Sequence, residues 1–139
     1  MFIIYTAPTK EIMDLRLQVF VNEQKVPLEL ELEDDESQFL HIACLQNNQT
    51  VATTRIGFNM KTMTAHIGRV AVSQKFRKQG LGRTIMEYAH QLIKICQYSK
   101  VELGAQLYAQ KFYQKLGYTP YGDNYLDANI PHINMQKLL

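Results

Sequence analysis

The segment at residues 68–89 decides the fold, and it reads GRVAVSQKFRKQGLGRTIMEYA. It starts as an alternating apolar strand, passes through a loop that contains Gly80 and Gly82, and ends as an amphipathic helix. A helix that follows such a loop presents unpaired N–H groups and the positive end of its dipole to the loop. Glycine lets an anion approach the backbone closely, so we expect this turn to bind a phosphate or pyrophosphate.

The charges around the turn support an anion site and narrow the class of ligand. Four basic residues flank the glycines, namely Lys75, Arg77, Lys78 and Arg83. No acidic residue lies between Ser73 and Thr84. A nucleoside triphosphate-binding P-loop has lysine where Arg83 stands, and a dinucleotide-binding loop has its third glycine where Ile85 stands. Both classes are therefore disfavoured, and a glycine-rich turn with a solvated run of charges is the alternative interpretation.

The composition of the whole chain indicates one ordinary domain spanning residues 1–139. With 139 residues, of which 46% are hydrophobic and 20% charged, the chain can bury one core but not two. Its net charge of +2 is too small to indicate a nucleic-acid or membrane partner. No run approaches the roughly 18 apolar residues of a membrane span, and the N-terminus does not resemble a signal peptide. We therefore expect a cytoplasmic protein.

Neither the cysteines nor the histidines are spaced as metal ligands. Cys44 and Cys96 have apolar neighbours and no CxxC spacing, so we expect two buried free thiols in a reducing compartment. The histidines show no HxH or HxxxH spacing, and no metal site is predicted. We expect His90 on the solvated side of its helix, and His41 and His66 in hydrogen bonds within strands.

Outward from the turn, the apolar patterns predict alternating strands and helices. Strands are expected at 2–5, 39–46, 50–58, 64–72 and 100–105 and in the C-terminal tail. Helices are expected from about Pro8 to about Glu23, from Leu81 to about Cys96, and over about ten residues ending at Gly117. Three antiparallel strands followed by strand-helix-strand connections require at least one parallel pairing, so the fold class is α/β (α+β) with a mixed sheet.

The segment EQKVPLELELEDDESQ, at residues 23–38, holds a dense run of carboxylates. Its leucines alternate with acidic residues at Leu28, Leu30 and Leu32, which predicts an extended segment with one packed face. The opposite face would then carry a row of carboxylates, opposite in charge to the basic loop.

The loop RKQGLG at residues 77–82 resembles the [RQ]xxGx[GA] motif of the GNAT superfamily of N-acetyltransferases. The strand GRVAV precedes the loop at the spacing found in that family. Further segments, LRLQVFVNEQKVP, VATTRIG, IGRVAV, AQLYAQKFYQKLGY and IPHINM, are similar to those of the ElaA-like or YjcF-like branch. Because the segments occur in the right order over nearly the whole chain, the protein is identified as similar to this branch.

The resemblance implies a GNAT fold, with a six- to seven-stranded, mostly antiparallel sheet, helices on both faces and two central strands that splay apart. Acetyl-CoA is then the expected cofactor, with its pantetheine paired to the backbone of Val70 and Val72 and its pyrophosphate in the loop. The implied cofactor contacts are Val70, Ala71, Val72, Arg77, Lys78, Gln79, Gly80, Leu81, Gly82, Arg83, Gln106, Ala109 and Tyr113.

Acetyl transfer from a thioester to an amine needs a neutral amine, support for an oxyanion and a proton for the leaving thiolate. The resemblance implies that the N–H of Val72 meets the oxyanion and that Tyr113 protonates the thiolate. A phenol with a pKa of about 10 can do so if its helix positions it well. Core packing is the alternative for Tyr113, because it lies on the apolar face of that helix. Gln106 stands where asparagine is common, which leaves its cofactor contact open.

The acidic segment and one histidine are candidates for activating the amine. The carboxylates could attract a cationic amine, and Glu31 or Glu33 could pass its proton to solvent. A solvated charged face is the alternative. His132 lies in the family-like segment IPHINM and is the candidate base or acceptor contact.

Further acceptor contacts are expected at Glu23, Arg16 and Arg55, which lie in family-like segments; the two arginines could instead pair with the acidic segment. The predicted activity is direct transfer from acetyl-CoA to a primary amine of a small molecule, because neither cysteine has a base beside it in sequence. One alternative is an acyl-CoA-binding sensor or assembly module without turnover. Another is an enzyme that acetylates protein lysines or N-termini. A homodimer is compatible with the free final strands.

Overall fold

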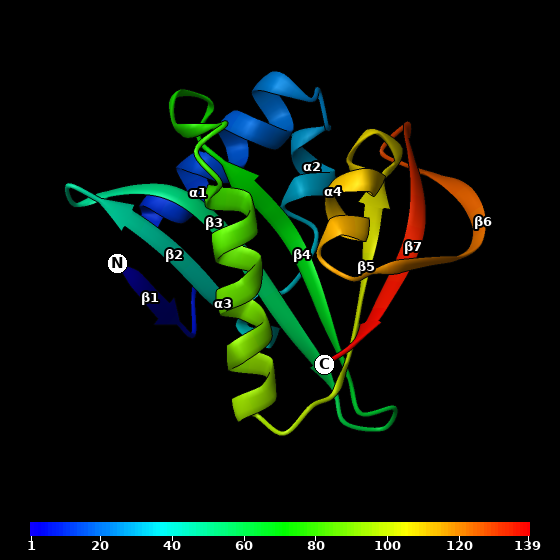
Figure 1. Ribbon diagram of the computed structural model, residues 1–139. Helices are drawn as coiled ribbons and strands as arrows, with labels where there is room; N and C mark the ends of the chain where they lie inside the picture. Colours follow the sequence, from blue (N-terminus) through cyan, green and yellow to red (C-terminus); the bar gives the residue numbers. More distant parts are fainter.

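An antiparallel meander of three strands forms the centre of the molecule (Figure 1). The computed structural model describes all 139 residues. The strands are β1 (Phe2–Tyr5), β2 (Leu40–Gln46), β3 (Gln49–Asn59), β4 (Thr64–Val72), β5 (Lys100–Gln106), β6 (Thr119–Asp127) and β7 (Ile130–Leu138). They form one sheet in the order β1-β2-β3-β4-β5-β7-β6, in which only β4 and β5 run parallel. The predicted mixed, mostly antiparallel sheet is confirmed.

Helices cover both faces of this sheet, as expected (Figure 1). The helices are α1 (Lys10–Arg16), α2 (Leu28–Glu31), α3 (Leu81–Ile95) and α4 (Gln110–Lys115). A π-helix (Leu17–Glu23) continues α1 to the predicted end near Glu23, and 3₁₀ turns lie at Glu36–Gln38, Gln74–Phe76 and Leu107–Ala109. The α1 side packs Leu15 and Val19 against Ala71 of β4. No helix has the length and apolar character that crossing a membrane requires.

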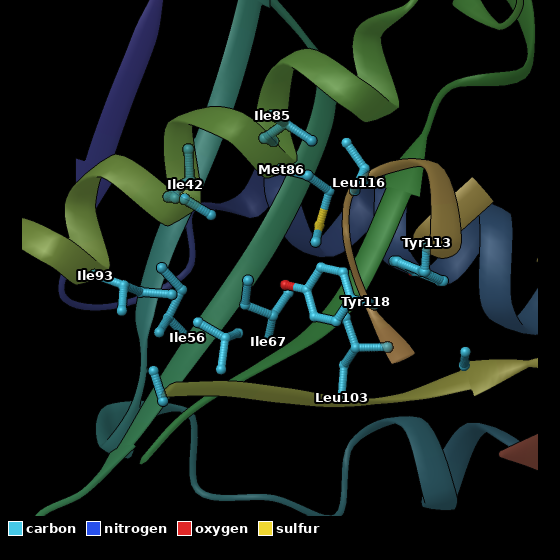
Figure 2. Packing of buried hydrophobic residues seen from close by; sticks show 14 of the residues in the cluster. Ile42, Ile56, Ile67, Ile85, Met86, Ile93, Leu103, Tyr113, Leu116 and Tyr118 are labelled. Atoms are coloured by element: carbon cyan, nitrogen blue, oxygen red, sulfur yellow. The ribbon is translucent and has the colours of Figure 1, made fainter. Parts of the chain in front are cut away.

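The main core lies between α3 and the opposite face of the sheet (Figure 2). The α3 residues Ile85, Met86 and Ile93 are fully buried there against side chains such as Ile56 and Ile67. Their spacing is the helical stripe that the sequence predicted. Each such side chain contributes about 1.5–3 kcal/mol by leaving water, so this layer fixes α3 and therefore the loop at its N-terminus.

The central strands β4 and β5 splay apart. Their parallel pairing covers only three residue pairs, from Thr64 with Lys100 to His66 with Glu102. Beyond these pairs, β4 continues along β3 to Val72, while β5 continues along β7 to Gln106. The splay that the family resemblance implied is therefore present, and it opens one edge of β4.

A β-bulge lies in β4 just beyond the point of splay. Thr53 pairs with Ala71 and Arg55 with Gly68, so a single β3 residue faces two residues of β4. Within the bulge, Arg69 has a φ of +51°, in the left-handed region that few non-glycine residues adopt. Bulges bend a strand and redirect its side chains, and this one turns Arg69 toward the opening.

The acidic segment is not extended as predicted. Residues Leu28–Glu31 form a short helix, and the three alternating leucines are 38–48% exposed. Glu31, a candidate proton relay for which a solvated face was the alternative, is buried, so the alternative is wrong for this residue. The reason is electrostatic: the carboxylate of Glu31 pairs with Arg16 and Arg69, and these contacts outweigh the packing of the leucines.

Two smaller expectations also fail. His90 is buried rather than solvated, and its Nε2 lies 2.7 Å from the hydroxyl of Tyr118, the residue after Gly117. Gly117 ends α4 with a φ of +96°, as the sequence predicted. Both cysteines are free, but only Cys44 is buried and Cys96 is exposed in the turn after α3.

Candidate active site

Two cavities adjoin at the open edge of β4. The first, here called the inner cavity, lies between β4 and β5 and has a volume of about 390 Å³. Its walls come from residues 66–70 of β4, from β5, from the acidic segment and from the β6–β7 hairpin. The second, here called the loop cavity, covers the N-terminus of α3 with about 280 Å³. Val70 lines the inner cavity and Val72 the loop cavity, so both cavities have walls from the last residues of β4.

The structure gathers most of the predicted site residues around these cavities. The inner cavity is lined by Glu31, Glu33, Arg55, Val70, Gln106, Ala109, Tyr113 and His132. The loop cavity is lined by Val72, Arg77, Lys78, Gly80, Leu81, Gly82 and Arg83. Four predicted residues line neither cavity, namely Arg16, Glu23, Ala71 and Gln79. Ala71 faces α1 on the far side of the sheet.

The loop cavity is built from backbone. Gly80 precedes α3 with a φ of +78° and leaves the first turn of the helix without a side-chain cap. The N–H groups of that turn have no earlier helical carbonyl to bind, so they remain available for an anion. A Cβ added at Gly82 would lie 3.3 Å from the Phe112 ring, which shows how closely the walls approach the backbone. The geometry fits the predicted phosphate or pyrophosphate site.

The basic side chains around the loop cavity are partly engaged. Arg77 pairs with Glu23 (Nη1 to Oε2, 2.9 Å) and donates from Nε to the carbonyl of Val72 at 3.0 Å. Arg83 pairs with Glu87 at 2.8 Å along the exposed face of α3. These contacts order the loop against the end of β4, and they give Glu23 a partner outside the inner cavity.

The open edge of β4 presents backbone donors. The N–H of Ser73 donates to the Val51 carbonyl of β3 at 2.8 Å. Successive residues of a strand point their N–H groups to opposite edges, so the N–H of Val72 points away from β3, toward the gap. No strand pairs with this edge after His66. An extended ligand could therefore add to β4 as a strand would.

Tyr113 lies on α4 with its ring buried between Phe112 and Tyr118, at centroid distances of 5.0 and 5.9 Å. Tyr113 packs in the core, as one interpretation expected, and it also lines the inner cavity, so its catalytic role stays a prediction. Its hydroxyl makes no hydrogen bond within the protein. Burial raises the pKa of Tyr113, so the phenol is protonated at neutral pH and is a weaker acid than a phenol in water. Gln106, the last residue of β5, donates from its side-chain amide to Gln24 Oε1 at 2.8 Å.

A network of buried ion pairs forms the wall behind the inner cavity. Arg16 donates from Nε to Glu31 at 2.8 Å and from both terminal nitrogens to Glu36 at 3.0 Å. Its side chain is 1% exposed. Although burial alone would lower it, the pKa of Arg16 is raised by these two carboxylates. Arg16 thus takes the second of its two predicted roles, pairing with the acidic segment.

Arg55 continues the network. It donates to both oxygens of Glu36, at 2.9 and 3.0 Å, and pairs with Asp34, while its guanidinium lies 4.0 Å above the Phe39 ring. Although burial alone would raise it, the pKa of Glu36 is lowered by Arg16 and Arg55. His41 hydrogen-bonds the Glu36 backbone carbonyl at 3.0 Å, as expected of a strand histidine, and burial lowers its pKa.

Arg69 is a cavity residue that the sequence reasoning did not single out. Its Nε is 2.9 Å from Glu31 Oε2, yet the two are poorly aligned and the Nε has no hydrogen bond. Burial lowers the pKa of Arg69. The sequence feature that could have identified Arg69 is a charged residue inside an otherwise apolar strand, GRVAV. Such a side chain needs a partner that the strand itself does not supply.

His132 is held in one orientation. Its Nδ1 lies 2.6 Å from the carbonyl of Ile130, and its ring stacks on Tyr125 at a centroid distance of 5.7 Å. A carbonyl only accepts hydrogen bonds, so Nδ1 carries the proton and Nε2 of the neutral ring is left to accept. Elsewhere, the structure contains no group of three or more His, Cys, Asp or Glu side chains arranged to hold a metal ion.

Comparisons with known proteins agree with this geometry. The family model described as an acetyltransferase (GNAT) domain matches residues 8–139. The uncharacterised N-acetyltransferase YjcF of Bacillus subtilis is 33% identical, over 92% of this chain and 91% of its own. ElaA of Escherichia coli is 33% identical over 91% of this chain and 84% of its own. The crystal structure of ElaA covers 99% of both chains with a TM-score of 0.85.

The chain belongs to the GNAT acetyltransferase family. Its fold is also shared by a GNAT acetyltransferase of Elizabethkingia anophelis that was solved with acetyl-CoA bound. That protein is 18% identical and superposes with a TM-score of 0.73 over 100% of this chain and 97% of its own.

Proposed function

We propose that this protein transfers an acetyl group from acetyl-CoA to a primary amine of a small molecule by direct attack, with both substrates bound together. One observation carries the proposal: the open edge of β4 joins a backbone-built anion cavity to a second cavity that contains Tyr113 and His132. A donor can lie along the edge while an acceptor occupies the inner cavity.

The chain's residues fit coenzyme A. The first turn of α3 would hold the pyrophosphate, and the backbone of Val70 and Val72 would pair with the pantetheine arm. The acetyl-CoA bound to the Elizabethkingia relative, which has the same fold, supports this choice of cofactor. When bound, acetyl-CoA supplies a thioester carbonyl that an amine can attack.

Three groups of this chain then have one catalytic role each. The N–H of Val72 meets negative charge on the carbonyl oxygen. Tyr113, which lines the inner cavity, donates to the departing sulfur. His132 accepts the amine's proton at Nε2, because Nδ1 is committed to Ile130. Glu31 is less suited to this role than predicted, since its carboxylate lies between Arg16 and Arg69. Glu33 has no ion-pair partner and lines the cavity, where it can attract a cationic amine.

The test is release of free thiol from acetyl-CoA by the purified protein. The acceptor panel contains polyamines, amino sugars, aminoglycosides, amino acids and a lysine peptide. Amine-dependent release, with the acetylated amine identified by mass spectrometry, is expected. If acetyl-CoA binds but no amine raises release above background, the protein is a binding module and the proposal is wrong. If only the lysine peptide raises thiol release, the acceptor is a protein lysine and not a small molecule.

A further inference from the structure

The three arginines of the buried network differ in how far their donors are used. Arg16 donates from all three of its nitrogens, and Arg55 donates from both terminal nitrogens. Arg69 makes a single long hydrogen bond, from Nη2 to the Glu31 carbonyl at 3.5 Å. Its Nε is buried without a hydrogen bond. A guanidinium offers five N–H groups in a fixed fork, so Arg69 keeps most of its binding capacity.

Arg69 lines the inner cavity and keeps unused donors on its terminal nitrogens. The bulge, where its φ is +51°, turns this residue out of the regular ladder, and it lines the cavity beside Val70. Its side chain remains 24% exposed, against 1% for Arg16 and 7% for Arg55. The Nε is buried beside Glu31, so the donors that a ligand can reach are the terminal nitrogens of the guanidinium.

The charges around Arg69 permit an anion there. The network balances Arg16, Arg55 and Arg69 against Glu31, Asp34 and Glu36, so it has three charges of each sign and no net negative charge that would repel an anion from Arg69. Glu33 and Asp127 also line the cavity, and neither makes an ion pair. The cavity thus presents a cation with free donors on one wall and unpaired carboxylates elsewhere. A molecule that carries both charges is its complement.

We infer that Arg69 binds the carboxylate of the acceptor, and that the acceptor is therefore an amino acid or a similarly small molecule with both a primary amine and a carboxylate. The planar fork of Arg69 matches the two oxygens of a carboxylate. Apolar walls from Phe20, Val26 and Leu30 complete the cavity and favour an apolar side chain. This inference rests on the proposed acetyl transfer.

Amino acids and their decarboxylated amines provide the test, because each pair differs only in the carboxylate. The pairs are leucine with 3-methylbutylamine, phenylalanine with 2-phenylethylamine, and methionine with 3-methylthiopropylamine. For at least one pair, kcat/KM for the amino acid should exceed that for the amine at least ~10-fold, as expected for a charge-assisted hydrogen bond. Equal kcat/KM within every pair would overturn the inference while leaving the acetyl transfer intact.

The variant Arg69→Gln locates the effect. It should lower kcat/KM for the amino acid about 10- to 100-fold and change that for the amine less than about 3-fold. Glu31 keeps Arg16 as its partner, so the fold should persist, which a thermal melt checks. Lys61→Gln, an exposed change in the β3–β4 turn, is the matched control and should alter neither value. Equal losses on both substrates would overturn the role of Arg69.

Binding provides a readout that does not need turnover. Calorimetry with coenzyme A present should show leucine binding to the wild type, and weakened binding to Arg69→Gln. If no amine is acetylated but leucine binds in this Arg69-dependent way, acetyl transfer fails and the carboxylate site stands. Leucine binding that survives Arg69→Gln would instead overturn the site, whatever the activity.

Discussion

The loop before α3 and the ion-pair network behind the inner cavity are built in opposite ways. The loop uses backbone N–H groups and glycine conformations from one short stretch, residues 77–83. The network uses side chains that come from α1, the acidic segment, β3 and β4. A backbone site accepts any ligand that carries the right anion, whereas a side-chain site can be changed one residue at a time. We take the first as the part common to acyl-CoA donors and the second as the part that selects the acceptor.

The largest expected effect comes from breaking the network at its most buried member. Arg16→Leu removes a guanidinium that is 1% exposed and leaves Glu36 and Glu31 each with one partner fewer. Removing one partner of a buried ion pair costs about 3–5 kcal/mol, so the free energy of unfolding in urea should fall by that amount. Lys10→Gln, which breaks the exposed pair with Asp14, is the control and should change the free energy of unfolding far less, because solvent screens exposed pairs. Equal losses would show that the network is no more than a surface feature.

The free energy of unfolding should depend on pH in two different ranges, one set by His90 in the core beneath α3 and one set by Glu36 in the network. Burial lowers the pKa of His90 from 6.5 to about 4. The unfolded chain therefore binds a proton below pH 6.5 that the folded protein refuses, and stability falls as the pH drops from 6.5 toward 4. At roughly 1.4 kcal/mol per pH unit the loss approaches about 3 kcal/mol.

The variant His90→Gln should lose this part of the slope. Glu36 affects stability at lower pH. Its folded-state pKa lies below the ordinary 4.5, so its ion pairs stabilise the fold fully above pH 4.5, and this stabilisation is lost as the pH falls through the folded-state pKa. Urea unfolding at half-unit steps from pH 7 down to about pH 2 measures both. An unchanged slope in His90→Gln would mean that His90 is not held neutral.

Tyr113→Phe tests the wall of the inner cavity. Turnover should fall at least ~10-fold, because the proton donor to the departing sulfur is lost, while the Kd for acetyl-CoA should stay nearly unchanged. Tyr118→Phe is the matched control: its hydroxyl bonds His90 rather than facing a cavity, so it should affect stability and not turnover. Unchanged turnover in Tyr113→Phe would remove this residue from the mechanism and leave it a packing role.

Adding one methyl group to each cavity should produce the smallest effects, and they should differ in kind. Gly82→Ala places a Cβ 3.3 Å from Phe112 and should raise the Kd for acetyl-CoA several-fold. Gly104→Ala places a Cβ 2.5 Å from the Tyr125 hydroxyl, which must move and disturb the ring stacked on His132. It should raise KM for the acceptor and leave the Kd for acetyl-CoA unchanged. If both variants alter the same constant, the two cavities do not divide the substrates.

The two regions also differ in how well the sequence predicts them. The loop is contiguous, so its glycines, basic residues and flanking strand and helix could be recognised together in residues 68–89. The stripe that begins at Leu81 placed α3 correctly for the same reason. Local patterns of this kind report local structure.

The network joins residues that are 15 to 38 positions apart in the sequence, and no local sequence pattern predicts such pairs. The alternation of Leu28, Leu30 and Leu32 therefore indicated a strand, whereas the contacts of Glu31 with two distant arginines produced a helix and buried a carboxylate. The prediction that His90 is solvated failed for the same reason, because its partner Tyr118 lies 28 residues away in the sequence. Tertiary pairing of charged and polar groups decided each of these cases.

The central claim, that donor and acceptor occupy adjoining cavities at the same time, is tested most directly by initial-rate kinetics. Acetyl-CoA and the best amine of the panel are varied against each other, and thiol release is recorded. Double-reciprocal plots should give lines that intersect, as a ternary complex requires. Parallel lines, with acetyl-labelled protein trapped in the absence of amine, would show a covalent relay and contradict the account.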